Sequence, residues 1–182
     1  MTRIVAVSGS RREASTTRAA LHVALDAAAD AGAETDMIDL GAVDLPLYHP
    51  DEDAQGDSEA LKRRVREADG VLAGTPVYRG SYSSTFKSFH DFCGSDEYAN
   101  TAVGLLATAG GGSYGGTLEH LRSTFRNVHA WTVPHEVGIE GASRVVETDD
   151  ADTGPRIVDD DIRRRTETLG RVVVEHAERL QG

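Results

Sequence analysis

The sequence predicts an α/β fold in which five parallel strands form one sheet with helices on both of its faces. Five short apolar runs alternate along the 182 residues with five segments of helical periodicity. Several of these runs, such as residues 70–74 and 101–108, are continuously apolar, which is typical of strands buried on both faces. Alternation of this kind predicts right-handed crossovers and a sheet of order 2-1-3-4-5.

The first two strands come from the beginning of the chain. Residues 3–7 are apolar and lead through a polar turn into a helix whose apolar face ends near Asp30. Residues 33–40 begin with an alternation of apolar and polar side chains, which favours a strand. A long loop with Pro46 and Pro50 follows, and loops of this length in compact domains are often functional.

The other strands alternate with the remaining helices. Pro134 favours an edge position or an irregularity in the last strand, and Asp159 or a neighbour is expected to cap the last helix. A polar, acidic loop at residues 147–156 separates these two elements. In chain order we expect helices at residues 57–68, 83–92, 117–126 and 159–180, and strands at residues 70–74, 101–108 and 130–139. The sum is a three-layer sandwich of the flavodoxin-like type, formed by one domain over residues 1–182.

The composition excludes several classes of partner. The chain has 30 acidic and 19 basic residues, and its net charge of −11 argues against binding to nucleic acid or to an anionic membrane. Lysine occurs only at Lys62 and Lys87, so the basic residues are mostly arginines. The acidic excess predicts an acidic surface and suggests adaptation to high salt.

Cys93 is the single cysteine, which excludes an intrachain disulfide and argues against a cysteine-based metal site. No apolar run approaches the roughly 20 residues that span a membrane. We therefore expect a soluble, cytoplasmic protein with no metal.

The loop after the first strand, residues 8–18, predicts a phosphate site. Its sequence S-G-S-R-R-E-A-S-T-T-R joins a strand to a helix, and backbone N–H groups at a helix start attract anions. The loop combines hydroxyls with positive charge on an acidic background, at Ser10, Ser15, Thr16 and Thr17 and at Arg11, Arg12 and Arg18. The alternative is a solvated turn with an ordinary Ser/Thr cap, which needs one hydroxyl and no arginine.

Two further loops are expected at the same edge of the sheet. One covers residues 75–81, T-P-V-Y-R-G-S, and the other covers residues 108–115, T-A-G-G-G-S-Y-G. Glycines let a backbone approach a ligand closely, while Pro76 stiffens its loop and Tyr78 offers a ring. Together with the phosphate loop, they favour a flat aromatic ligand with a phosphate tail.

At these motifs the chain resembles the NAD(P)H-dependent FMN reductases. The similar pieces are G-S-R-R-E-A-S at 9–15, L-P-L-Y at 45–48, P-V-Y-R-G-S at 76–81 and A-G-G-G-S-Y-G-G-T at 109–117. The resemblance implies that the FMN phosphate binds to Ser10, Arg12, Ser15 and Thr17, with Thr16 in the same turn. It implies that the isoalloxazine is lined by Pro76, Val77, Tyr78, Arg79, Gly80 and Ser81, and on its other edge by Thr108, Gly110 and Gly111.

The resemblance also implies the chemistry. Hydride passes from NAD(P)H to FMN, and electrons then pass to a small-molecule acceptor such as free flavin, a quinone, an azo compound or a metal oxyanion. No side chain is expected to act as the catalyst, because the flavin carries the reaction. Members of the family often form dimers or tetramers, so we expect a homodimer or homotetramer.

The sequence is also compatible with two other functions. Gly110 to Gly115 form a literal G-x-G-x-x-G after a strand, and Glu136 lies near the offset of a ribose-binding acid, so a dinucleotide site without flavin is one alternative. The other is a flavodoxin-like electron carrier or a non-catalytic flavin-binding protein. Bleaching of a bound flavin by NADPH or NADH distinguishes a reductase from a carrier.

Overall fold

A computed structural model describes residues 1–53, 55–148 and 154–182 of the chain. Its main sheet has the strand order β2-β1-β3-β4-β5, and all four neighbouring pairs are parallel. The predicted fold class and strand order are confirmed. The strands are β1 (Arg3–Ser8), β2 (Glu34–Asp39), β3 (Gly70–Pro76), β4 (Ala102–Thr108) and β5 (Trp131–Ile139).

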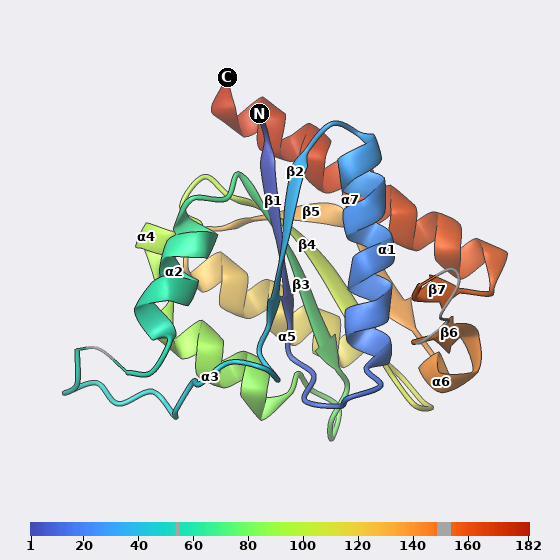
Figure 1. Cartoon of the computed structure of the whole chain (residues 1–182), viewed down its shortest axis with the longest axis horizontal. Helices are drawn as coiled ribbons and strands as arrows, with labels where there is room; N and C mark the ends of the chain where they lie inside the picture. The colour runs from blue at the N-terminus through green and yellow to red at the C-terminus, as the bar shows by residue number, and fades with distance from the viewer. Residues whose placement is uncertain (54, 149–153) are drawn as a thin grey trace.

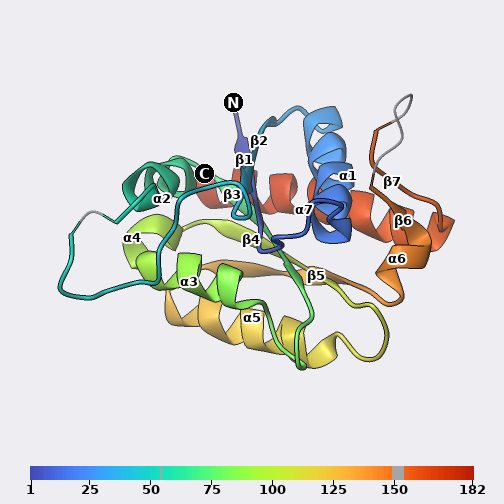
Figure 2. The same cartoon turned by 60° about the horizontal axis from the view of Figure 1, so that its bottom comes forward.

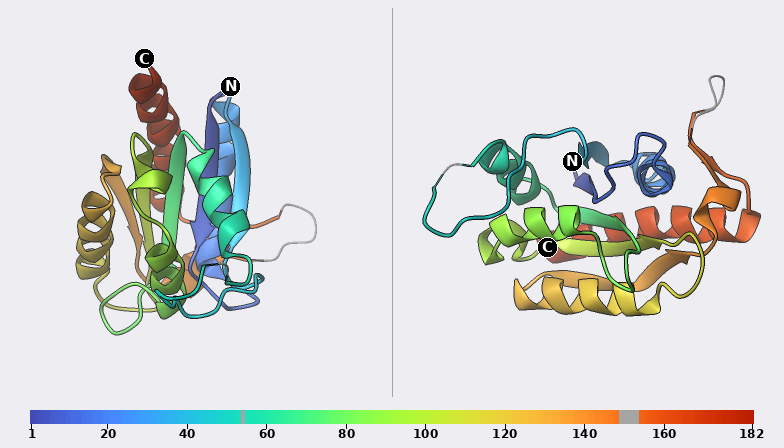
Figure 3. Two further views of the ribbon diagram at one scale, coloured as in Figure 1. Left: turned by 90° about the vertical axis from the view of Figure 1, so that its left-hand side faces the viewer. Right: turned by 90° about the horizontal axis from the view of Figure 1, so that it is seen from below.

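Helices cover both faces of this sheet, so the molecule has three layers (Figures 1 and 3). One core cluster joins the sheet to α1 and α7, and a second joins it to α2, α3 and α5. Every residue of β3 and β4 is buried, as their continuous apolar runs predict. The main helices are α1 (Thr16–Asp30), α2 (Ser58–Arg66), α3 (Ser84–Phe92), α5 (Gly115–Asn127) and α7 (Asp160–Gln181).

The ends of several elements follow directly from their residues. Asp159 caps α7, because its carboxylate accepts hydrogen bonds from the backbone N–H groups of Asp161 and Ile162. β5 lies at the edge of the sheet, and its register with β4 shifts between Val103 and Leu105, opposite Pro134. The expected effect of Pro134 is therefore confirmed: a residue without an N–H is tolerated where pairing is irregular.

Four short elements were not predicted from the sequence. These are α4 (Ser95–Tyr98), α6 (Ala142–Val145) and an antiparallel pair formed by β6 (Val146–Glu147) and β7 (Arg156–Ile157). Elements of two to four residues are too short to show a period, so no pattern marks them. Residues 149–153, the middle of the predicted acidic loop, lie outside the described residues.

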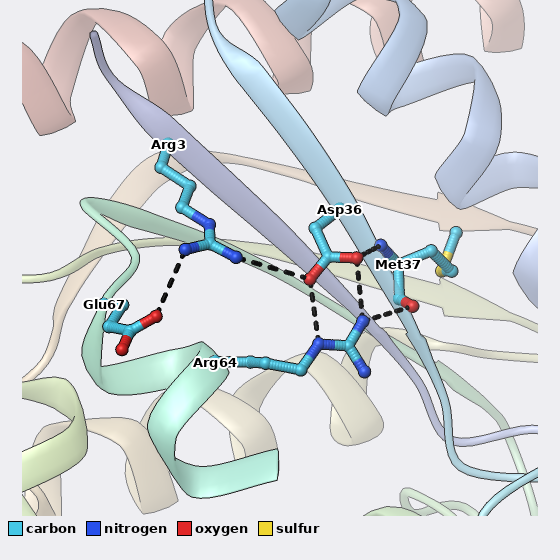
Figure 4. Close-up of polar contacts among 5 residues, drawn as sticks. All are labelled: Arg3, Asp36, Met37, Arg64 and Glu67. Atoms are coloured by element: carbon cyan, nitrogen blue, oxygen red, sulfur yellow. Dashed lines mark hydrogen bonds and ion pairs between the residues drawn. The ribbon is translucent and has the colours of Figure 1, made fainter. Parts of the chain in front are cut away.

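An ion-pair network ties β1 and β2 to α2 (Figure 4). The Arg64 guanidinium donates to both carboxylate oxygens of Asp36, each at 2.8 Å, and to the Met37 carbonyl. Arg3 lies 3.9 Å from Asp36 and 3.2 Å from Glu67. The hydrogen bond from Arg64 lowers the pKa of Asp36 below its usual value of 3.8. This carboxylate therefore favours the folded state most when it is ionised.

The three loops of interest leave one edge of the sheet. The segments after β1, β3 and β4 follow the carboxyl ends of parallel strands and lie at the lower edge in Figure 1, which Figure 2 turns toward the viewer. Both termini lie at the opposite edge. Among the described residues, no helix is both long and apolar enough to cross a membrane.

Candidate functional site

A cavity of about 280 Å³ opens where these three loops meet. It lies at the carboxyl ends of the strands, which is where open α/β sheets bind ligands. Nine of the fourteen predicted site residues line it, and they come from the three loops that follow β1, β3 and β4. These nine are Ser10, Arg12, Thr16, Thr17, Pro76, Val77, Tyr78, Thr108 and Gly110.

The phosphate-loop end of the cavity combines one cation with several hydrogen-bond donors. Arg12 lines the cavity, and its guanidinium has no carboxylate partner within the described part of the chain. Ser10 is buried, and its hydroxyl accepts from the Arg12 backbone N–H at 3.3 Å, which leaves its own proton free to donate. Thr16 and Thr17 form the first turn of α1, whose leading N–H groups have no acceptor within the helix. This end suits an anion.

The three arginines of the loop lie in different surroundings. Arg18 is an ion-pair partner of Asp39 at 2.7 Å and also donates to the Glu13 carbonyl, so it supplies no unpaired charge. Arg11 is exposed and borders a separate small hollow. The sequence places three arginines in this loop, and the family resemblance singles out Arg12 for the phosphate. Of the three, Arg12 is the one that lines the cavity.

Two predicted residues bind each other across the site. The hydroxyls of Thr17 and Thr108 lie 2.6 Å apart and are both buried, which joins the start of α1 to the end of β4. One of the two hydroxyls donates in this contact, so the proton of the other remains available. The pair therefore links two of the segments that line the cavity and can still donate one hydrogen bond to a ligand.

A tight turn presents Tyr78 at the rim of the cavity. Tyr78 and Ser81 exchange two backbone hydrogen bonds of 2.9 and 3.1 Å around Arg79 and Gly80, both of which have positive φ. This pattern is typical of a two-residue hairpin turn. The Ser81 hydroxyl also lies 3.0 Å from Nδ1 of His120 on α5, which anchors the turn from outside.

The glycine loop after β4 is open on the cavity side. A Cβ atom on Gly110 or Gly111 would meet no atom within 4 Å, so packing inside the protein does not require glycine there. Gly138 differs, because a Cβ atom on it would lie 1.9 Å from the Tyr114 ring. Tyr114 thus packs against β5 at Gly138 and fixes the far end of the loop.

Some predicted residues lie outside the cavity lining, and some lining residues were not predicted. Ser15 caps α1 by accepting from the Arg18 N–H at 3.1 Å. Ala109, Ala142 and Ser143 line the cavity but were missed. The small residues after β5 were the available signal, since β5 ends at the same edge. The predicted residues outside the lining are Ser15, Arg79, Gly80, Ser81 and Gly111.

Two larger hollows and one candidate acid among the described residues lie outside this cavity. Larger hollows of about 670 and 640 Å³ flank α5, away from the three loops. Glu136, the candidate ribose acid, is paired with Arg122 at 2.6 Å, which weakens the dinucleotide alternative. Within residues 1–53, 55–148 and 154–182, no group of three or more potential metal ligands comes together.

Comparison with known proteins shows the family of this chain and supports its fold. The family model of NADPH-dependent FMN reductases matches residues 2–144, which contain all the loops that form the cavity. The chain belongs to the NADPH-dependent FMN reductase family. Its members transfer electrons from NAD(P)H through FMN, so this family member is an NAD(P)H-dependent flavin oxidoreductase.

Two curated relatives cover most of the chain. An NADPH azoreductase of Bacillus sp. is 33% identical over 143 residues, which are 76% of this chain and 77% of the relative. An NADH-dependent FMN reductase of Pseudomonas putida is 33% identical over 135 residues, which are 72% and 73% of the two chains. The family resemblance read from the loops is confirmed.

Solved structures of other flavoenzymes share the fold. The NAD(P)H:(acceptor) oxidoreductase FerB of Paracoccus denitrificans superimposes with a TM-score of 0.79 at 21% identity and covers 98% of both chains. The apo NADH:FMN oxidoreductase EMOB gives a TM-score of 0.73 at 22% identity and covers 98% of this chain and 90% of its own. These similarities show the three-layer architecture.

Proposed function

We propose that the cavity at the carboxyl edge of the sheet binds FMN. In this proposal the phosphate lies against Arg12, Ser10 and the first turn of α1, where Thr16 and Thr17 offer N–H and hydroxyl donors. The ring system lies between the turn after β3 and the glycine loop after β4. The observation that carries the proposal is that Arg12 lines this cavity without a carboxylate partner among the described residues, on a chain of net charge −11.

The residues present fit such a ligand. A guanidinium, two or three hydroxyls and a helix N-terminus are the donors that phosphate prefers. Gly110 leaves room beside the cavity, since a Cβ atom there would meet no atom of the described residues within 4 Å. Pro76 and Val77 supply an apolar wall, as expected for a site that holds a flat ring.

FMN, when bound, supplies the redox chemistry: it accepts a hydride from NAD(P)H and delivers electrons to an acceptor. The protein supplies position and access. The Val77 N–H donates to the Thr108 carbonyl at 2.8 Å, so the turn after β3 is fixed to the end of β4. Tyr78 is about half exposed at the rim, where it borders the path of an entering substrate. Ser15, Arg79, Gly80, Ser81 and Gly111 are proposed to support these contacts from the surrounding loops.

The proposed electron acceptor is a small molecule. The similarity to an NADPH azoreductase makes an azo compound the first acceptor to test, followed by quinones, free flavin and metal oxyanions. NADPH and NADH are both candidate donors, since the two relatives differ in this respect. A homodimer or homotetramer in the cytoplasm is also proposed, as the resemblance to the family implies, and the adjacent exposed side chains of Leu47 and Tyr48 are candidates for the contact.

Absorption spectroscopy of the purified protein tests the proposal. FMN is added to the protein, excess is removed, and NADPH or NADH is mixed in without oxygen. We expect a bound flavin band that bleaches within seconds, followed by oxidation when an azo dye is added. A flavin band that neither nucleotide bleaches indicates an electron carrier. A protein that retains no FMN contradicts the proposed site.

A further inference from the structure

We propose that Ser83 is a positioning residue that holds the phosphate loop against the loop lining the flavin ring. Ser83 has no place in the cavity lining. It lies behind the site, where the segment after β3 enters α3, and it is 2% exposed. The inference rests on the proposed FMN site. It states that Ser83 fixes the position of the phosphate loop relative to the loop that lines the flavin ring, which are the two halves of that site.

The Ser83 side chain joins these halves directly. Its hydroxyl donates to the Gly9 carbonyl at 2.6 Å, and Gly9 is the first residue of the phosphate loop after β1 ends at Ser8. The same oxygen accepts from the Phe86 N–H at 3.0 Å and so caps α3. Its backbone N–H donates to the Thr75 hydroxyl at 2.9 Å, at the end of β3. One buried residue therefore contacts the phosphate loop, β3 and α3.

The approach of the phosphate loop to α3 is as close as the chain allows. A Cβ atom on Gly9 would lie 2.7 Å from the Phe86 Cβ and 2.9 Å from the Ser83 hydroxyl. The Gly9 N–H also donates to the Gly74 carbonyl at 2.8 Å. Both backbone groups of Gly9 are therefore hydrogen-bonded. The N–H binds to the backbone of β3, and the carbonyl binds to the Ser83 side chain.

Loss of the hydroxyl is expected to release this loop. Alanine at position 83 would leave the Gly9 carbonyl and the Phe86 N–H, both at a buried position, without the partners that they have here. The loop that carries Ser10 and Arg12 then loses its fixed position relative to Pro76 and Tyr78. A ligand that binds both halves at once is affected more than a ligand that binds one half.

Affinities for FMN and for riboflavin test this inference, because riboflavin lacks the phosphate. We expect Ser83→Ala to weaken FMN binding about tenfold, to leave riboflavin binding within about twofold, and to reduce the effect of Arg12→Ala on FMN binding. Ser83→Thr keeps the hydroxyl and is expected to restore FMN affinity. If Ser83→Ala does not fold, Ser83→Cys, a weaker donor of similar size, is expected to show a smaller loss of the same kind.

Asp159→Ala is the matched control, since it removes the side-chain cap of another helix, α7, and Asp159 does not belong to the cavity lining. It is expected to lower stability without changing either affinity. Parallel losses of FMN and riboflavin affinity, unchanged FMN affinity, or additive effects of the Ser83 and Arg12 substitutions would each overturn the inference. A wild-type protein that binds no FMN refutes the proposed site instead.

Discussion

At the scale of single residues, the neighbours of a charge decide its role more than its type does. Arg12 and Arg18 belong to the same loop and the same sequence motif. Arg18 is held by Asp39 from the neighbouring strand, whereas Arg12 faces the cavity without a described carboxylate partner. An unpaired guanidinium next to hydroxyl donors can form a bidentate contact with phosphate.

Arg12→Ala is expected to weaken FMN binding by ~1–3 kcal/mol, the scale of one lost hydrogen-bonding group with charge. Riboflavin affinity is expected to stay within about twofold, because the lost contact is with the phosphate. Fluorescence titration of the two flavins measures both values.

Arg11→Ala is the matched control for this variant. It removes the same charge one residue earlier, but Arg11 borders a different hollow. FMN affinity is expected to change by less than about twofold. Equal losses for both variants would show that FMN responds to general charge rather than to a contact with Arg12.

At the scale of the element, two glycines in and near the site serve opposite needs. Gly110 faces open space, so its missing side chain leaves room for a ligand. Gly138 lies under the Tyr114 ring, so its missing side chain lets the protein pack against itself. Substitution by alanine separates these two roles.

Gly138→Ala is expected to destabilise the protein by ~1–3 kcal/mol, because the added methyl group must displace the Tyr114 ring. Gly110→Ala is expected to leave stability unchanged and to weaken FMN binding by about tenfold (~1.4 kcal/mol). Urea unfolding and flavin titration measure the two effects. The interpretation fails if Gly110→Ala unfolds more easily than Gly138→Ala.

The ion pair between Asp36 on β2 and Arg64 on α2 predicts how stability depends on pH. Because Arg64 lowers the pKa of Asp36, the ionised carboxylate stabilises the fold above about pH 4, and this stabilisation is lost as the pH falls through the lowered value. Asp36→Asn is expected to cost about 1 kcal/mol at pH 7, as for a partly exposed ion pair.

The difference in unfolding free energy between wild type and Asp36→Asn is expected to shrink between about pH 5 and about pH 3. Urea denaturation at several pH values measures it. Asp91→Asn, in an exposed pair with Lys87 on α3, serves as the control and is expected to change stability little at any pH. A constant difference across this range would contradict the role of Asp36.

Elements with a clear period were predictable, and those set by tertiary contacts were not. The runs that form β3 and β4 are apolar throughout, so their burial follows from the sequence. The pair β6 and β7 has two residues in each described strand and leaves no such pattern. Their formation depends on where β5 ends and how α1 packs nearby.

The same distinction holds for the site. Hydroxyls, glycines and arginines after strands β1, β3 and β4 predicted which loops meet. They did not predict that Arg18 forms an ion pair with Asp39, because that contact joins residues 21 positions apart on different elements. Ser143, in α6, was missed because the segment after β5 carries no cluster of donors, although it also follows a strand at this edge.

At the scale of the whole molecule, the charge of −11 sets the balance between repulsion and local ion pairs. Self-repulsion of excess carboxylates destabilises a compact chain, and dissolved ions screen it over about 10 Å at 0.1 M salt. The pairs on α7, such as Arg164 with Asp161, are exposed and contribute little on their own.

The melting temperature is therefore expected to rise as KCl increases from about 0.05 M to about 1 M. Differential scanning calorimetry measures this change, with sucrose as an uncharged control for general exclusion effects. A melting temperature that falls with KCl would show that ion pairs outweigh repulsion and would remove the case for adaptation to high salt.

The bond between Thr17 and Thr108 also has a consequence for how the protein is made. It joins two hydroxyls separated by 91 positions in the chain. Contacts between distant residues form late in folding, since a long loop must close first. A nascent chain that has completed β1 and α1 therefore has a phosphate loop but lacks one wall of the cavity. Binding of FMN is therefore expected only after β4 has joined the sheet. Stopped-flow refolding should show flavin binding only in the last phase.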